Sequence, residues 1–445
     1  MKKRTSEFAT RGALALVLLL ALPSMTFAGF LRGDSNDDGV VSPLLDSVHM
    51  LVVAFDGGTF ACEDAVDADD NGVISPIVDA LYLLLYGFFD GPAPAAPGTL
   101  VRGNDPTDDT LSCHSGYSWL APEDIAALSD TGLAWDNVVE WSDEAILEVN
   151  ICDQNDADDI RALSRALVGI RNDDADKIAE ARTALIDVIG TEDNLDCTPL
   201  GPARQLGTWI LVAELVGFET AADETLFRDW VVEMLTFDVT TWTVTSIHEV
   251  RPNNWGTHAG FSRTVAALYL NDHDEYLAAR DVFRGWLGER DVYSDFDYGN
   301  TCWQSAPLEP VGINPVGATL LIEGELRSVD GALPEEMRRV TGVDDSSAGC
   351  PPTYPFAAEP YAWEALQGAV ALAAVLDRQG EDVWEWSDQA LLRATEWLVN
   401  EAGYDPSGDD EWILHMINHA YGTDYTSELP ATPGKGFGFT DWVCE

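Results

Sequence analysis

A duplicated acidic loop near the N-terminus is the feature that most constrains how this chain can fold. The pattern Asp-x-Asn-x-Asp-Gly begins at Asp34, and the pattern Asp-x-Asp-x-Asn-Gly begins at Asp67, 33 residues later. An apolar stretch with helical spacing follows each loop. Self-similarity at such a period indicates one supersecondary unit that occurs twice. The sequence therefore predicts a small repeated module over residues 29–91.

Both loops have the composition of calcium sites. Calcium takes roughly six to eight oxygen ligands on a tightly turned loop, in which a glycine permits the turn. In each copy, side chains at alternate positions, one backbone carbonyl and a closing aspartate can supply oxygens. The predicted ligands are Asp34, Asn36, Asp38, Val40, Asp46, Asp67, Asp69, Asn71, Val73 and Asp79. The closing aspartate stands at the thirteenth loop position, not the twelfth, because a proline is inserted. An acidic turn without an ion is the alternative.

The N-terminus has the pattern of an export signal. Basic residues precede an apolar run at 13–22, and small residues lead to a cleavage site after Ala28. The run is too short to span a bilayer, so residues 1–28 are predicted to be a signal peptide, with an uncleaved anchor as the alternative. The mature protein is then periplasmic, extracellular or held at the cell surface. Seven widely spaced cysteines predict one or more disulfides with an odd thiol left over.

Charge limits the possible partners. The formal net charge is −53, which argues against a nucleic acid because phosphates would be repelled. The same charge opposes an anionic polymer over long range. Such a substrate would need a locally basic cleft, for which the sequence offers Arg251, Arg338, Arg339 and Lys435. No further stretch of the sequence suggests a transmembrane span.

The remainder of the chain is predicted to be helical. A Pro- and Gly-rich linker, 92–117, precedes a domain over 118–445. Residues 206–216 and 361–376 are apolar on nearly all sides, which is typical of buried helices, while other stretches are amphipathic. The main strand candidate is 239–246. Outer amphipathic helices that alternate with buried ones predict an all-α fold, an incomplete (α/α) toroid behind an EF-hand-like module.

Three segments of the helical domain carry chemically useful side chains. Asn254 and His258 are four residues apart and share a face if a helix begins near Asn254. Arg338 and Arg339 follow Glu335 and Glu336. Tyr361 opens one of the buried helices.

On these residues, the domain from about Ser118 to Glu445 resembles the alginate lyase family of α/α-toroid polysaccharide lyases. The segments 120–124, 132–136 and 434–442 extend the likeness. The N-terminal module resembles the tandem dockerin-like repeats of secreted enzymes. The likeness implies a secreted lyase that degrades an anionic, uronate-containing polysaccharide, with structural calcium and no cofactor for catalysis. It further implies that the dockerin-like module has a structural or tethering role, with a protein as partner.

The resemblance also assigns roles to residues. Asn254 matches the family's asparagine, Arg338 or Arg339 its arginine, and Tyr361 its tyrosine. Trp255 stands where the family has a histidine, and His258 is the candidate replacement. In β-elimination, an amide stabilises the uronate carboxylate and the developing enolate, a base removes the C5 proton, and an acid protonates the leaving oxygen. The base is then His258 or Tyr361. A free tyrosine has a pKa of about 10, so a nearby arginine must stabilise the phenolate.

Each of these residues also has a structural interpretation. Asn254 could cap a helix, His258 and Tyr361 could be core residues, and the arginines could pair with surface glutamates. His415 and His419 are interpreted as a structural pair. Two other functions compete with the lyase. A glycoside hydrolase would use paired carboxylates, and a carbohydrate-binding surface protein would use none. The carboxylates available to a hydrolase are Glu364, Asp409, Asp410 and Glu411.

Overall fold

The computed structural model describes residues 30–36, 40–56, 60, 62–89, 91–100, 111, 117–147, 149–193, 197–339 and 347–444. The predicted signal peptide, Asp38 and most of the predicted linker lie outside these ranges. The described part is mostly helical, and its strands are one short hairpin, β1 (Thr319–Ile322) with β2 (Glu325–Ser328). The all-α fold class is therefore confirmed.

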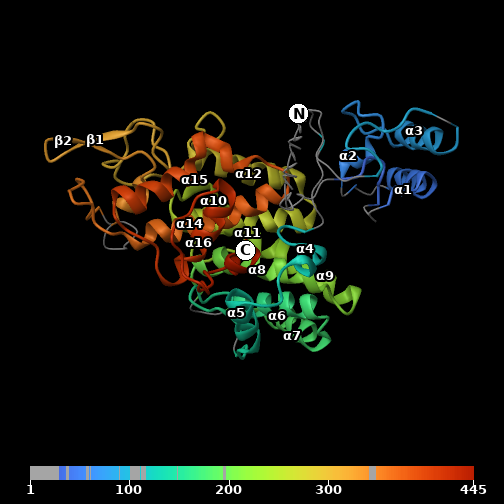
Figure 1. The fold of residues 1–445 in the computed structure, drawn as a ribbon, viewed down its shortest axis with the longest axis horizontal. Helices are drawn as coiled ribbons and strands as arrows, with labels where there is room; N and C mark the ends of the chain where they lie inside the picture. Colours follow the sequence, from blue (N-terminus) through green and yellow to red (C-terminus); the bar gives the residue numbers. More distant parts are fainter. Residues whose placement is uncertain are drawn as a thin grey trace, which may run out of the picture.

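The N-terminal residues build a small unit with its own core. It contains α1 (Pro43–Asp56), α2 (Glu63–Val66) and α3 (Pro76–Phe88), and α1 packs against α3. A proline begins both long helices, where its missing N–H costs nothing. The core residues of this unit are Met50, Val66, Ala68, Ala80 and Leu83. They form a cluster separate from the large core, and Figure 1 shows the unit at one end of the molecule.

The larger domain is a stack of helices, some joined by short turns and others by long loops. Helix α13 is short and lies in the long connection between α12 and α14. The helices are α4 (Pro122–Ala127), α5 (Leu133–Asp143), α6 (Asp158–Asn172), α7 (Ala175–Asp187), α8 (Leu200–Val216), α9 (Ala221–Thr236), α10 (Val244–Val250), α11 (Asn254–Leu270), α12 (His273–Leu287), α13 (Pro334–Met337), α14 (Pro360–Arg378), α15 (Trp386–Glu396), α16 (Trp412–Tyr421) and α17 (Thr440–Val443).

Helices α8, α11 and α14 form the centre of this domain. Helix α11 packs along both α8 and α14, and nearly every residue of the three is buried. Two glycines permit the close approach. A Cβ on Gly207 would lie 2.5 Å from the Phe261 ring, and one on Gly368 would lie 2.4 Å from the backbone nitrogen of His258. The predictions of buried helices at 206–216 and 361–376 are confirmed, and Figure 1 shows these helices surrounded by the others.

The strand prediction at 239–246 is wrong. The structure has a single bridge between Val239 and Trp242, and α10 begins at Val244. Thr243 and Ser246 form a capping box, in which the Thr243 side chain accepts the Ser246 N–H. β-branched residues favour strands, but here the local hydrogen bond of the cap starts a helix.

Disulfides stabilise the loops of the larger domain. Cys152 pairs with Cys197 and Cys302 with Cys350, Cys62 is also disulfide-bonded, and Cys444 is free. The prediction of disulfides with an odd thiol left over is confirmed. Of the helices in the described ranges, none has the length and apolar character needed to cross a bilayer.

Candidate functional site

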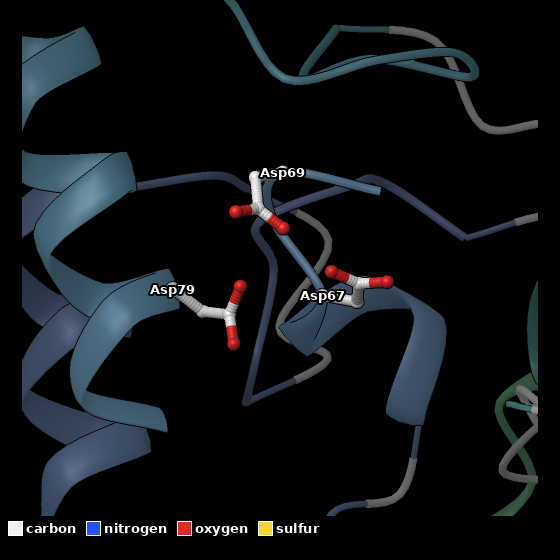
Figure 2. Close-up of side chains that lie close together, drawn as sticks. All are labelled: Asp67, Asp69 and Asp79. Atoms are coloured by element: carbon white, nitrogen blue, oxygen red, sulfur yellow. The ribbon is translucent and has the colours of Figure 1, made fainter. Parts of the chain in front are cut away.

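The second acidic loop brings three carboxylates together. One oxygen from each of Asp67, Asp69 and Asp79 lies within 4.8 Å of the others, although Asp67 and Asp79 are fully buried. Asp67 follows α2, and Asp79 lies in the first turn of α3 (Figure 2). Backbone N–H groups hold two of the three. The Asp67 carboxylate accepts hydrogen bonds from the N–H of Asn71 at 3.2 Å and from the N–H of Gly72 at 2.7 Å. Asp79 Oδ2 accepts a hydrogen bond from the N–H of Ser75 at 2.8 Å.

Among the described residues, no lysine or arginine forms an ion pair with a carboxylate of this triad, and Arg32 pairs with the adjacent Asp70 instead. Burial, together with the neighbouring carboxylates of Asp67 and Asp69, raises the pKa of Asp79 to about 6. Burial and Asp67 also raise the pKa of Asp69. Asp79 Oδ1 is buried and has no hydrogen-bond partner among the described residues. Hard oxygens that repel one another, one of them unpartnered, fit a calcium ion. The Val73 side chain has no oxygen, so this residue can offer only its backbone carbonyl.

The first loop repeats part of this arrangement. Asp46 Oδ2 accepts from the Ser42 N–H at 2.7 Å, as Asp79 does from Ser75, and its Oδ1 accepts from Ser35 at 3.1 Å. The two closing aspartates, both at the thirteenth position, are thus held in the same way. Asp34 is buried, whereas Asn36 and Val40 are exposed. Within the described part of the chain, only the second loop gathers three carboxylates.

In the helical domain, three distant segments converge on Asn254. Its Oδ1 accepts a hydrogen bond from Arg339 Nη1 at 3.1 Å, and the Arg339 guanidinium lies 4.6 Å from the centre of the Tyr361 ring. Asn254 is the first residue of α11, Arg339 follows α13, and Tyr361 is the second residue of α14. The structure therefore brings together the predicted asparagine, arginine and tyrosine.

Asn254 does not cap its helix. The cap is Asn253, whose side chain accepts the Trp255 N–H at 3.1 Å. The side chain of Asn254 is instead fully buried, and its Nδ2 has no hydrogen-bond partner among the described residues. A buried amide that leaves a donor unpaired is uncommon and calls for an explanation, which a ligand would provide.

His258 lies one turn further along α11. It is 1% exposed, and its Nε2 has no hydrogen-bond partner in the described ranges and lies 3.9 Å from Glu364 Oε2. Burial lowers the pKa of His258 well below the usual value, and the nearby cations of Arg204 and Lys435 act in the same direction. The ring is therefore neutral at physiological pH, but it is much less accessible than Tyr361, which is only half-buried.

Glu364 links a second group of charges to the same face of α14. It forms ion pairs with both Arg204 of α8 and Lys435 of the C-terminal loop. Lys435 Nζ also lies 3.0 Å from Asp409. The next residue after Asp409, Asp410, accepts a hydrogen bond from Gln367 Nε2 at 2.7 Å. Burial raises the pKa of Asp410 to about 7. Sequence reasoning missed Arg204 because it lies within an otherwise apolar helix.

Arg338 and Arg339 contact different partners, a difference that the sequence could not show. Arg338 pairs with Glu335 (Nε to Oε2, 2.8 Å), and its guanidinium lies so close to Gly299 that a Cβ there would be 2.3 Å from Arg338 Cζ. Arg339 pairs with Glu336 at 2.6 Å and contacts Asn254 and Tyr361. Both are buried, so the interpretation as surface charges is wrong, and Arg339 is the arginine that contacts Asn254 and Tyr361.

The cations proposed for a basic cleft are largely neutralised. Arg338, Arg339 and Lys435 each pair with at least one carboxylate, and the Arg251 guanidinium packs between the rings of Trp242 and Trp255 at 5.4 and 5.2 Å. The polar cluster is thus close to charge balance. His415 Nε2 contacts the Glu428 carbonyl at 2.9 Å, in agreement with a structural role.

No family model, curated protein or solved structure matches the chain. The likenesses to alginate lyases and to dockerin repeats therefore stay predictions from the residues themselves.

Proposed function

We propose that the chain is an exported polysaccharide lyase that cleaves a uronate-containing, alginate-like polysaccharide by β-elimination. The observation that carries this function is the buried Asn254 side chain, which keeps Nδ2 unpaired while Arg339 and Tyr361 lie beside it. A uronate carboxylate is an acceptor that would pair with this donor. The incomplete toroid belongs to the same proposal, with α8, α11 and α14 as its inner helices.

In this function, Asn254, Arg339 and Tyr361 divide the steps of the elimination among them. Asn254 Nδ2 donates to the uronate carboxylate, which withdraws charge from C5 as the enolate develops. The Tyr361 phenolate oxygen, stabilised by Arg339, accepts the C5 proton. The C4–O bond then breaks as the C4–C5 double bond forms, and the proton passes from Tyr361 to the leaving glycosidic oxygen. Tyr361 is preferred to His258 as the base because its ring lies beside the Arg339 guanidinium, which also contacts Asn254.

The ends of the central helices support binding of an anion at this position. The first five residues of α8, α11 and α14 include Arg204, Asn254, Tyr361 and Glu364, and contacts among them join the three ends. Helix N-termini carry partial positive charge and favour anions. This contribution matters because the arginines and the lysine of the cluster are already paired with carboxylates.

The test is to incubate the full-length mature protein with a panel of uronate polymers and to follow the ultraviolet absorbance of unsaturated ends. Absorbance should rise with the wild type and should be lost in Tyr361→Phe. Tyr425→Phe, on the loop after α16, is the matched control and should stay active. The lyase proposal fails if no polymer yields absorbance, or if Tyr361→Phe retains full activity.

One observation favours hydrolysis as a second candidate. Asp410, with a pKa of about 7, lies beside the Glu364 cluster, and two acids in contrasting environments suit acid–base hydrolysis of a glycoside. A hydrolase would release reducing ends without ultraviolet absorbance. Binding of a polysaccharide with neither product would instead indicate a non-catalytic carbohydrate-binding surface protein.

We propose further that the N-terminal unit is a dockerin-like, EF-hand-like module that holds structural calcium. Asp67, Asp69 and Asp79 would supply carboxylates, with Asn71 and Val73 completing the second loop, and the first loop would do the same with its equivalents. The module would tether the enzyme to a protein partner. Exposed apolar side chains on α1 and α3, such as Leu45, Val48, Val78 and Leu81, offer a surface for it. The disulfides support an exported location.

A further inference from the structure

Glu336 connects α13 to the start of α11. Its Oε1 accepts a hydrogen bond from the backbone N–H of Asn254 at 2.6 Å, and its Oε2 accepts from Arg339 Nη1 at 2.6 Å. The same Nη1 donates to Asn254 Oδ1 at 3.1 Å. One carboxylate therefore holds the backbone of Asn254 directly and its side chain through the guanidinium.

These contacts fix which way the Asn254 amide faces. Because Arg339 occupies Oδ1, the unpaired Nδ2 must point away from the guanidinium. Asn254 is fully buried, while Glu336 and Arg339 are each 1% exposed, so solvent cannot substitute for a lost contact. Hydrogen-bonded partners of this kind orient the groups that act on a ligand.

We infer that Glu336 is a positioning residue of the proposed lyase site, whose carboxylate holds Asn254 and Arg339 so that Nδ2 faces the uronate. This inference rests on the proposed function for its catalytic consequence. Its structural part, that the charge state of Glu336 controls Asn254, stands on the contacts alone. In the sequence, the one feature that points to Glu336 is its Glu-x-x-Arg spacing, which Glu335 shares.

The charges around Glu336 make this role dependent on pH. Arg339 and Glu335 come from its own segment, Glu359 caps α14, whose Tyr361 contacts Arg339, and α11 contributes the uncharged Asn254. Burial raises the pKa of Glu336 to about 7, against the opposing effects of Arg339 and the Asn254 N–H. As the pH falls through 7, Glu336 takes up a proton and the ion pair with Arg339 is lost. Activity should therefore fall on the acidic side.

The experiment compares Glu336→Gln with Glu335→Gln in the full chain. The two glutamates are both buried and each pairs with the arginine three residues later, but only Glu336 contacts Asn254. Glu336→Gln should lower kcat about 10- to 100-fold at pH 8 with little change in KM, and should abolish the acidic limb near pH 7. Glu336→Asp should recover part of the lost kcat and should show the acidic limb of the pH profile again. Glu335→Gln should keep the limb, whatever it does to stability.

A second measurement does not depend on activity. In protein labelled with [15N]asparagine, the Asn254 backbone amide resonance should titrate with a midpoint near pH 7 in the wild type and should not titrate in Glu336→Gln. If the wild type cleaves no polymer, the proposed function fails while this titration still decides the role of Glu336. An Asn254 amide that does not respond to pH in the wild type, or an acidic limb that persists in Glu336→Gln, overturns the inference.

Discussion

The acidic loop and the helical cluster hold their carboxylates in opposite ways. In the loop, Asp67, Asp69 and Asp79 lie within 13 consecutive residues, and nearby backbone N–H groups hold Asp67 and Asp79. Among the described residues, none of the three pairs with a lysine or arginine. In the cluster, Glu364 and Arg204 are 160 residues apart, and most carboxylates face a protein cation. In the proposed function, an external cation balances the charge of the loop. The cluster is balanced in charge but leaves neutral polar atoms unpaired.

The difference teaches what each region can bind. A group of carboxylates that repel one another gains most from a small hard cation. A balanced cluster with an unpaired amide gains most from a ligand that brings its own acceptor. The following predictions test whether the two regions really differ in this way.

The largest effect is expected from Asn254→Ala in the helical cluster. Loss of one preorganised donor to a developing oxyanion typically costs about 10²- to 10³-fold in kcat. The neighbour Asn253 is the matched control because it is the helix cap. Asn253→Ala should cost about 1 kcal/mol in the free energy of unfolding and change kcat only a few-fold. Equal losses of activity in both variants, measured by absorbance assay and thermal unfolding, would mean that the amide is only structural.

Calcium withdrawal should affect the N-terminal unit and leave the helical domain unchanged. An ion that binds only the folded unit stabilises it by about 3 kcal/mol when its concentration is 100 times Kd. In calorimetry, a chelator should therefore lower the unfolding temperature of the N-terminal unit and leave that of the helical domain unchanged. Asp79→Asn should abolish this shift, whereas Glu63→Gln, outside the triad, should not. A chelator that moved the transition of the helical domain instead would contradict the contrast between the regions.

Acidification should weaken calcium binding through Asp79. Its pKa is raised from 3.8 to about 6, so the metal-free folded state holds a proton that the ion must displace. Affinity should fall about tenfold for each pH unit below 6 for this one proton. Acidification has the opposite effect on the free energy of unfolding of the calcium-free unit, which Asp79 increases at low pH. The contribution of Asp79 is fully present below about pH 4 and is lost as the pH rises through 6. Calcium titrations at pH 5 and 7 would show this, and a pH-independent affinity would refute it.

The smallest effect is expected from Asp409→Asn. Asp409 shares Lys435 with the more buried Glu364, and it is 37% exposed. An exposed ion pair contributes about 0.5 kcal/mol or less, so stability and lyase activity should change little. A large loss of activity, followed both as absorbance and as reducing ends, would instead point to Asp409 as a catalytic carboxylate of the competing hydrolase.

Much of the helical fold could be predicted because it depends on local patterns. Residues 206–216 and 361–376 are apolar on nearly all sides and form the largely buried parts of α8 and α14. The segment 239–246 failed because one side-chain hydrogen bond at Thr243 outweighed its β-branched composition. Local propensity differences are about 1 kcal/mol or less, so a single cap can reverse them.

The sequence by itself determined the acidic loops, since all their predicted ligands are neighbours along the chain. It also determined that Asn254 and His258 share one face of a helix, because four residues make about one turn. Only the tertiary structure decided that Arg339 rather than Arg338 contacts Asn254, that Asn253 is the cap, and that Glu336 and Arg204 belong to the cluster. Adjacent residues have the same local pattern, and which of them faces a partner 80 or more residues away depends on how the helices pack.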